Sequence, residues 1–197
     1  MQSIEGGGWG ARPSEDGEPG TVSVCQGDVR NGSIEGIELK CPVLVEERAL
    51  RRDSCGAGKY RGGLGIDVRV RNFVDGTWSF ERPRRSLHPA WGLWGGEPGG
   101  ASDYLLERPG ESRFSSPQPV RNAVPAQSRA IVRTGGGGGW GNPLERDPEA
   151  VRWDVIEGFV SREAAERDYG VAVGADYAID TVGTSALRQA AKRGRAS

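Results

Sequence analysis

The sequence contains little histidine and little cysteine, which limits the chemistry that it can carry out. His88 is the single histidine, and the three cysteines are Cys25, Cys41 and Cys55. No CxxC pair occurs, which argues against a structural zinc site, and we interpret the cysteines as ordinary reduced thiols. With one histidine, no G-x-S-x-G motif and no HExxH motif, the chain provides neither a serine hydrolase site nor a zincin site.

The chain also lacks an excess of charge of either sign and a long apolar run. Lys and Arg number 26 against 27 Asp and Glu, a net charge of −1, whereas dedicated nucleic-acid or membrane-surface binders carry a basic excess. No apolar run reaches the roughly 18 residues of a membrane-spanning helix. The N-terminus has no basic region followed by an apolar core, so it does not resemble a signal peptide. We therefore predict a cytoplasmic protein that binds neither nucleic acid nor membrane.

Glycine, in contrast, is abundant and clustered. It accounts for 32 of 197 residues, more than twice the usual share of about 7%. Five glycines follow one another at residues 135–139, and Gly6, Gly7 and Gly8 form a second cluster. Because glycine has no Cβ, such runs allow the backbone to pass close to a ligand, another chain or the protein's own core. We expect a small core with many tight turns, part of which could need a partner chain to bury it.

The glycine runs do not fit known phosphate-binding motifs. A P-loop requires GxxxxGK[ST], and in the segment of residues 56–60 Tyr60 follows Lys59 where a hydroxyl residue is needed. The segment of residues 62–65 precedes a predicted strand rather than joining a strand to a helix, so it fails the dinucleotide fingerprint. We expect no cofactor and no metal ion to be bound by this chain.

The first part of the chain is predicted to be rich in strands. Residues 34–49 alternate apolar and polar side chains, which indicates one long strand or two strands joined by a bend near Pro42. Residues 66–71 alternate in the same way, and Asp75-Gly76 then separates them from residues 77–80. A DG pair between such runs predicts a β-hairpin.

The middle of the chain predicts two more strands and two irregular segments. We expect strands at residues 104–107 and 130–133, separated by a surface loop over residues 109–125. Trp91 and Trp94 are predicted to anchor a loop rich in Pro and Gly onto the sheet. The residues expected to be buried in this part are Leu105, Leu106, Ile131 and Val132.

After the five-glycine run, the apolar period changes to that of helices. Asp147 and Pro148 are suited to begin a helix, on which Val151, Val155, Ile156 and Phe159 are expected to share one face. A second helix is predicted from Ser161 to near Gly170, a short strand at residues 171–173 and a last helix at residues 184–193. The resulting fold class is α+β: a glycine-rich, β-rich domain with hairpins at residues 1–146, followed by a short helical segment at residues 147–197 that packs on it.

Four glycine-containing motifs, in this order, resemble the hydantoinase B/oxoprolinase family. They are GGGWGARP at residues 6–13, DSCGAGKYRGGLG at 53–65, WGLWGGEPG at 91–99 and GGGGGWGNPLERD at 135–147. The segment DVIEGFVSREAAERDYG at residues 154–170 continues the likeness. This family contains B-type subunits of ATP-dependent hydantoinases and 5-oxoprolinases and related subunits of acetone- and acetophenone-type carboxylases.

The resemblance implies a working part of a multi-subunit enzyme complex. A partner A-type subunit would use ATP to phosphorylate a carbonyl or enolate oxygen, and the B-type chain would help to hydrolyse a cyclic amide or to carboxylate the activated carbon. The likeness covers only the C-terminal portion of the longer family chains, whose metal-binding His and Asp residues lie in their N-terminal portion. The implied partners are therefore an A-type subunit, a metal-binding N-terminal B-type half and a small-molecule substrate. ATP and a divalent metal are implied for the complex but not for this chain, which is not expected to be active alone.

The resemblance also suggests candidate residues at the substrate or at a subunit interface. These are Gly6, Gly7, Gly8, Arg12, Asn31 and Arg61. Arginine favours bidentate binding of carboxylate or phosphate, so Arg12 and Arg61 are candidate anion contacts, although both could instead form ordinary salt bridges between loops. Asn31 is the only residue of the segment CQGDVRNGS, residues 25–33, that matches the family pattern.

Three functions remain open at this point. The chain is a C-terminal part or small subunit of a cyclic-amide hydrolase of the hydantoin or 5-oxoproline type, or a subunit of an acetone- or acetophenone-type carboxylase. The third possibility is a non-catalytic assembly subunit or a truncated fragment.

Overall fold

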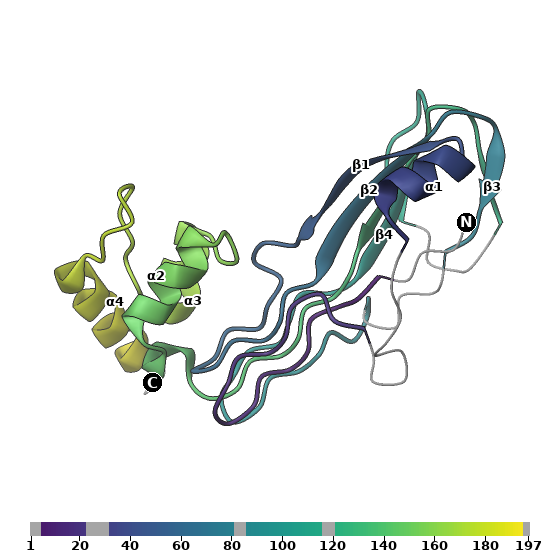
Figure 1. The fold of residues 1–197 in the computed structure, drawn as a ribbon. Coiled ribbons are helices and arrows are strands. Elements are labelled where there is room, and N and C mark those ends of the chain that lie inside the picture. Colours follow the sequence, from purple (N-terminus) through teal and green to yellow (C-terminus); the bar gives the residue numbers. More distant parts are fainter. Residues whose placement is uncertain (1–4, 23–31, 81–85, 116–120, 195–197) are drawn as a thin grey trace.

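The computed structural model describes residues 5–22, 32–80, 86–115 and 121–194. Figure 1 shows three parts that follow one another along an extended molecule: a β-sheet at one end, a bundle of extended glycine-rich segments in the middle and a cluster of helices at the other end. No helix in the described ranges has the length and apolar character that crossing a bilayer requires. The predicted cytoplasmic location stays a prediction.

The sheet has five antiparallel strands in the order β1-β2-β7-β4-β5. Their bounds are β1 Val43–Leu50, β2 Ile66–Asn72, β7 Arg129–Arg133, β4 Asp103–Glu107 and β5 Phe114–Ser115. The strands predicted at residues 66–71, 104–107 and 130–133 are thus confirmed. Period-2 alternation identified β2, and one face of the sheet is apolar, with Val68, Leu106 and Ala130 buried on it.

The opposite face of the sheet carries paired charges. Glu46, at the irregularity in the register of β1, contacts Arg71 and Arg129 at 3.0 Å each. Arg69 and Glu47 lie directly opposite one another on β2 and β1, with an ion pair of 3.5 Å. Cross-strand pairs of opposite charge stabilise a given register, so this face helps to align the strands.

Two predictions in this region were only partly right. Of the strand predicted at residues 34–49, the second half forms β1. Residues 34–40 instead form helix α1, Ile34–Lys40, because the Ser33 side chain accepts a hydrogen bond from the Gly36 amide and caps the first turn. Leu39 is 88% exposed, so the alternation of apolar residues there does not reflect burial.

The predicted hairpin across Asp75-Gly76 does not form either. Strand β3, Gly76–Trp78, pairs with β6, Asn122–Val124, and not with β2. The Asn72 side chain donates to the carbonyls of Val74 and Val124, and the Asp75 carboxylate accepts from Ala126. These bonds direct the chain toward the β6 segment, so the turn separates two sheets.

The segment predicted as a surface loop, residues 109–125, contains β5 and β6. Of the four residues expected to be buried in this part, Leu106 and Ile131 are fully buried, and Leu105 and Val132 are partly buried. Trp91 and Trp94 do not anchor their loop on the sheet, because they are 76% and 80% exposed.

The middle part is organised around the five-glycine run, residues 135–139. Residues three positions apart in the run form hydrogen bonds to the same neighbouring segment. The carbonyls of Gly135 and Gly138 accept from the amides of Gly8 and Ala11, at 2.9 Å each. A three-residue repeat is that of the polyproline II helix, which makes no internal hydrogen bonds and leaves its amides free for neighbours.

The same step of three occurs on another side of the run. The amides of Gly136 and Gly139 donate to the carbonyls of Gly100 and Glu97, at 3.0 Å each. The residue numbers of the run rise together with those of the segment that contains Gly8 and Ala11, so these two segments are parallel. They rise while those of the segment that contains Glu97 and Gly100 fall, so these two segments are antiparallel. Figure 1 shows these segments as closely spaced traces that lie side by side. The central run is therefore the axis of a hydrogen-bonded glycine bundle.

Close packing explains why this part of the sequence is glycine. A Cβ added at Gly137 would lie 1.8 Å from the Trp9 carbonyl oxygen, and one at Gly8 would lie 1.9 Å from the Gly63 oxygen. No side chain fits at such distances. The bulky object predicted next to the glycine runs is thus the backbone of the protein's own neighbouring segments.

The helical part contains a 3-10 turn η2, Pro143–Glu145, and helices α2 Pro148–Ile156, α3 Arg162–Tyr169 and α4 Thr181–Gly194. The first two helices begin where predicted: Asp147 and Ser161 cap them by accepting from the amides of Glu149 and Ala164. Gly170 ends α3 with a left-handed φ of 61°.

The prediction of the buried face of α2 was only partly right, and so were the predictions for the chain after α3. Val151 and Val155 are buried, whereas Ile156 is 36% exposed and Phe159 is only partly buried. No strand forms at residues 171–173; Val173 makes only an isolated bridge to Ile179. The last helix begins three residues earlier than predicted.

The helical core includes residues of the bundle. Ala57 is part of the cluster that contains Val151, Ala165 and Val171. The Asp53 amide donates to the Phe159 carbonyl at 3.0 Å. The helices thus pack against the bundle, and the division at residues 1–146 and 147–197 stays a prediction.

Candidate functional site

The three candidate glycines lie in the first segment of the bundle. Gly6 and Gly8 are buried, and a Cβ at Gly6 would lie 2.2 Å from the Gly20 carbonyl oxygen. Gly7 exchanges two backbone hydrogen bonds with Thr21. Internal packing therefore explains these glycines, and their role at a substrate or an interface stays a prediction.

The structure separates the two candidate arginines by environment. Arg12 is exposed and pairs with Glu15 at 2.9 Å, whereas Arg61 is 7% exposed and pairs with other residues. Asn31 lies outside the described residues. The candidates therefore do not form one anion site in this chain, and the anion contacts proposed for Arg12 and Arg61 stay predictions.

Arg61 belongs to a group of four charges where the bundle meets the helices, of which Arg61, Arg146 and Asp154 are buried and Asp16 is partly exposed. Its Nε lies 2.7 Å from Asp154 Oδ1, on helix α2. Arg146 Nη2 lies 2.8 Å from Asp154 Oδ2, and its two terminal nitrogens contact the two oxygens of Asp16 at 2.7 and 2.8 Å. We refer to Asp16, Arg61, Arg146 and Asp154 as the junction network.

Backbone groups hold this network in place. The Arg61 amide donates to Asp16 Oδ1 at 2.8 Å, and the Arg146 guanidinium also donates to the Lys59 carbonyl. Arg188 of α4 donates to the carbonyl of Arg146 at 2.6 Å. The network thus joins four parts of the chain that are far apart in sequence.

The charges of the network stabilise each other. Burial disfavours the ionised form of Asp16, but the hydrogen bond and charge of Arg146, with the charge of Arg61, outweigh burial and lower the pKa of Asp16. Burial likewise opposes the charge on both arginines, yet Asp154 and Asp16 raise the pKa values of Arg61 and Arg146. The shifted pKa values of Asp16, Arg61 and Arg146 therefore all favour the charged forms of these three groups.

Two further titratable groups lie near the network, and both are neutral. Burial raises the pKa of the Cys55 thiol to about 11, despite the opposing charge of Arg61. Burial also raises the pKa of Tyr169 well above its usual range, and its hydroxyl oxygen has no hydrogen-bond partner. A protonated thiol is a poor nucleophile, so Cys55 is a structural residue here.

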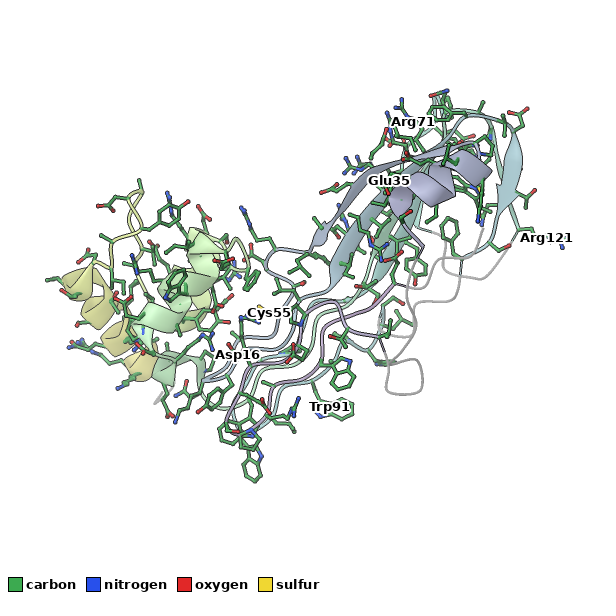
Figure 2. All side chains as sticks on the ribbon, in the orientation of Figure 1. Asp16, Glu35, Cys55, Arg71, Trp91 and Arg121 are labelled. Atoms are coloured by element: carbon green, nitrogen blue, oxygen red, sulfur yellow. The ribbon has the colours of Figure 1, made fainter. Side chains whose placement is uncertain are left out.

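The described part of the chain contains no complete reaction centre. No group of three or more His, Cys, Asp or Glu residues in the described ranges is placed to hold a metal ion. A hollow of about 390 Å³ beside the network is lined by residues that include Lys59, Tyr60 and Arg146, but Arg146 is already paired. Figure 2 shows Asp16 and Cys55 where the bundle meets the helices. This arrangement can hold two parts of a fold together, and it leaves no charged group of the network free for acid–base chemistry.

Sequence reasoning missed three of the four network residues. The sequence could have predicted that Asp154 is buried, because it shares one face of α2 with Val151 and Val155 at helical spacing. A carboxylate on such a face requires a buried partner. Nothing in the sequence around Asp16 or Arg146 marked them as that partner.

The order of the glycine segments, their mutual packing and the sheet beside them agree with one known family. The model for hydantoinase B/oxoprolinase matches residues 1–143. The chain belongs to the hydantoinase B/oxoprolinase family. The predicted resemblance is thus confirmed over the sheet and the glycine bundle.

Family relatives match almost the whole chain. It is 35% identical to a protein of Pseudomonas sp. (strain NS671) that is named as the B-type subunit of a D-/L-hydantoinase, over 93% of this chain and 31% of the relative. It is 30% identical to the acetone carboxylase alpha subunit of Xanthobacter autotrophicus, over 95% of this chain and 29% of that relative. The chain therefore spans about a third of the length of these relatives.

Solved structures confirm the α+β fold. The crystal structure of the ATP-dependent caprolactamase from Pseudomonas jessenii matches 93% of this chain and 32% of its own, with a TM-score of 0.78 and 29% identity. Nucleotide-free acetone carboxylase matches 96% of this chain and 30% of its own, with a TM-score of 0.77 at 24% identity. The glycine bundle with its sheet and helices is thus a recurring part of larger chains in this hydantoinase B/oxoprolinase family.

Proposed function

We propose that this chain is the C-terminal part or a small subunit of a hydantoinase B-type enzyme complex. With an ATP-using A-type subunit, the complex would hydrolyse a cyclic amide of the hydantoin or 5-oxoproline type. The observation that carries the proposal is the 35% identity to the B-type hydantoinase relative over 93% of the chain. The beta subunit of a caprolactamase, 31% identical over 93% of the chain, supports the same class, because a lactam is a cyclic amide.

Within such a complex this chain would act as a scaffold, and the reacting groups would come from elsewhere. ATP and a divalent metal would be bound by the A-type subunit and by the metal-binding N-terminal B-type half. The junction network supports this assignment, because its charged groups pair with one another, and so does the protonated Cys55. We therefore expect no turnover by the isolated chain, even with metal and ATP supplied.

A carboxylase of the acetone or acetophenone type is the second candidate. Identity of 30% to the acetone carboxylase alpha subunit, over 95% of this chain, supports it. A non-catalytic assembly subunit or a truncated fragment is the remaining alternative. Its support is that no group of three or more His, Cys, Asp or Glu residues in the described ranges is placed to hold a metal ion.

The test is purification of the tagged chain from its own cells, followed by native mass spectrometry and assays on the complex recovered. ATP-dependent ring opening of hydantoin, 5-oxoproline or caprolactam by that complex would support the proposal. ATP-dependent fixation of labelled bicarbonate onto acetone or acetophenone, without ring opening, would establish the carboxylase instead. Recovery as a lone chain without either activity would reject both enzymatic assignments.

A further inference from the structure

Two tryptophans and a leucine are presented to solvent by one short loop on the glycine bundle. Trp91 is 76%, Leu93 49% and Trp94 80% exposed. Large apolar side chains that gather in the open mark interaction surfaces, and tryptophan is enriched among the residues that dominate binding energy. We refer to residues 91–94 as the tryptophan loop.

The backbone of this loop is fixed. The Leu93 amide donates to the Gly139 carbonyl, and the Leu93 carbonyl accepts from the amides of Gly96 and Gly141, all at 2.9 to 3.0 Å. A Cβ added at Gly138 would lie 1.9 Å from the Trp91 carbonyl oxygen, so the loop sits directly against the central glycine run. Trp94 itself is held at a φ of 54°, a left-handed conformation that is uncommon for a bulky residue.

A fixed backbone favours a role in binding. Ordering a mobile loop on association reduces affinity, and a loop that is already rigid avoids that cost. An aromatic side chain adds large contact area with only two rotatable bonds. The tryptophan loop therefore has the properties of a preorganised anchor rather than of an unstructured connection.

The helices of this chain do not cover the loop. Cys55 packs against the helical core, and Figure 2 shows Trp91 on the other flank of the bundle, pointing away from the helices. Trp153, the exposed tryptophan of α2, is thus on a separate part of the surface. A partner that covers the tryptophan loop would therefore come from outside the described residues.

The lengths of the relatives indicate what that cover is. This chain spans 31% of the hydantoinase relative and 32% of the caprolactamase chain, so about two thirds of a B-type subunit has no counterpart here. Permanent interfaces are more apolar than transient ones and resemble a core cut in half. An exposed Trp-Leu-Trp surface therefore fits permanent contact with that remaining part.

We propose that the tryptophan loop is the docking surface for the polypeptide that corresponds to the remaining two thirds of a B-type subunit. This inference rests on the proposed function in one respect, since it names the partner within that assembly. It requires the two indoles to enter an apolar recess of that polypeptide. It does not require the assembly to act on any particular substrate.

Site-specific photocrosslinking in the cells of origin tests the proposal. The tagged full chain would carry p-benzoylphenylalanine in place of Trp94, and a matched chain would carry it in place of Leu39, which is 88% exposed on α1. We expect position 94 to crosslink to a polypeptide identified by peptide sequencing as the missing B-type part, and position 39 not to do so. Crosslinks from position 94 only to a second copy of this chain, only to an ATP-using subunit, or to nothing would each overturn the proposal.

Affinity provides the second measurement. The double variant Trp91→Ser/Trp94→Ser should bind that B-type polypeptide at least tenfold more weakly, and Trp153→Ser should bind it as the unaltered chain does. Circular dichroism must show that both variants keep the fold, which is expected because these side chains are exposed. An unchanged affinity of a folded double variant would reject the docking surface.

The outcomes separate this inference from the proposed function. A double variant that still joins a complex active on cyclic amides would reject the docking surface and leave the function standing. A chain that docks through the tryptophan loop into a complex without cyclic-amide hydrolysis would reject the proposed function and leave the docking surface standing.

Discussion

A single methyl group in the centre of the glycine bundle should destabilise the protein strongly. The change is Gly137→Ala, at a position where the added Cβ would lie 1.8 Å from the Trp9 carbonyl oxygen and 2.2 Å from its carbon. Ordinary contact begins at 3.4 Å, so the two segments would have to separate by roughly 1.6 Å. Both contacts are backbone atoms, which a change of rotamer does not move.

The magnitude follows from the bonds that such a separation disrupts. The segment that contains Trp9 is bonded to the run through the Gly8 amide, which donates to the Gly135 carbonyl, and the Ala11 amide, which donates to the Gly138 carbonyl, at 2.9 Å each. Each lost bond leaves a buried backbone group unpaired, at a cost of about 1–3 kcal/mol. We expect the free energy of unfolding to fall by about 3 kcal/mol or more, which for a chain of this length lowers the melting temperature by roughly 6–12 °C.

Gly10→Ala is the matched control in the same bundle. A Cβ at Gly10 meets only the Gly138 carbonyl oxygen, at 3.8 Å, so its effect should stay within about 0.5 kcal/mol. Urea unfolding of the three proteins, followed by tryptophan fluorescence and circular dichroism, measures both changes. Equal stabilities of Gly137→Ala and Gly10→Ala would refute the packing argument.

Three further predictions concern the junction network and its neighbourhood. Asp154→Asn leaves Arg61 and Arg146 without their shared buried carboxylate, and urea unfolding should show a loss of about 3–5 kcal/mol. Since the folded-state pKa of Asp16 lies below its ordinary value of 3.8, the stability that its ionisation contributes is complete above about pH 4 and is lost as the pH falls through the folded-state value. Asp16→Asn should therefore weaken the dependence of stability on pH in acid. Because the pKa of Cys55 is about 11, iodoacetamide at about pH 8 should modify this thiol far more slowly in the native protein than in urea.

Each of these predictions has an outcome that contradicts it. The network is not a buried anchor if Asp154→Asn costs no more than Arg12→Ala, which removes an exposed pair. The electrostatic reasoning fails if Asp16→Asn leaves the acid limb of the stability profile unchanged. Equal alkylation rates for Cys55 in native and unfolded protein would show that burial does not protect the thiol.

Strand β2 was predicted correctly because its alternation of apolar and polar residues matches burial, and this local signal needs no knowledge of the partners. β4 and β7 were predicted as short apolar segments, and each places a buried residue on the apolar face. α1 shows the limit of that signal, because none of its residues is buried and a cap at Ser33 decides its structure. The pairing of β3 with β6 depends on the Asn72 and Asp75 side chains bonding to a distant segment, and no pattern within residues 66–80 contains that information.

The candidate site was harder to predict because its parts come together only through the bundle. The glycine motifs identified the family, yet the charged residues that the structure brings together lie at positions 16, 61, 146 and 154. Arg61 was selected for its residue type, whereas its partners were not. The exposure of Trp91 and Trp94 was also missed, because aromatic residues in a loop rich in glycine are usually expected to hold that loop down.

The glycine bundle also constrains the order of events during folding. Its segments come from residues 6–21, 53–65, 90–100 and 134–141, and glycine loses more conformational freedom on folding than any other residue. Contacts between such distant segments form late, because the intervening chain must first be closed into loops. The segment of residues 6–21 therefore cannot form its hydrogen bonds to the central glycine run until residues 134–141 have been synthesised. The glycine bundle thus gains its stability only after its last segment, residues 134–141, has been synthesised.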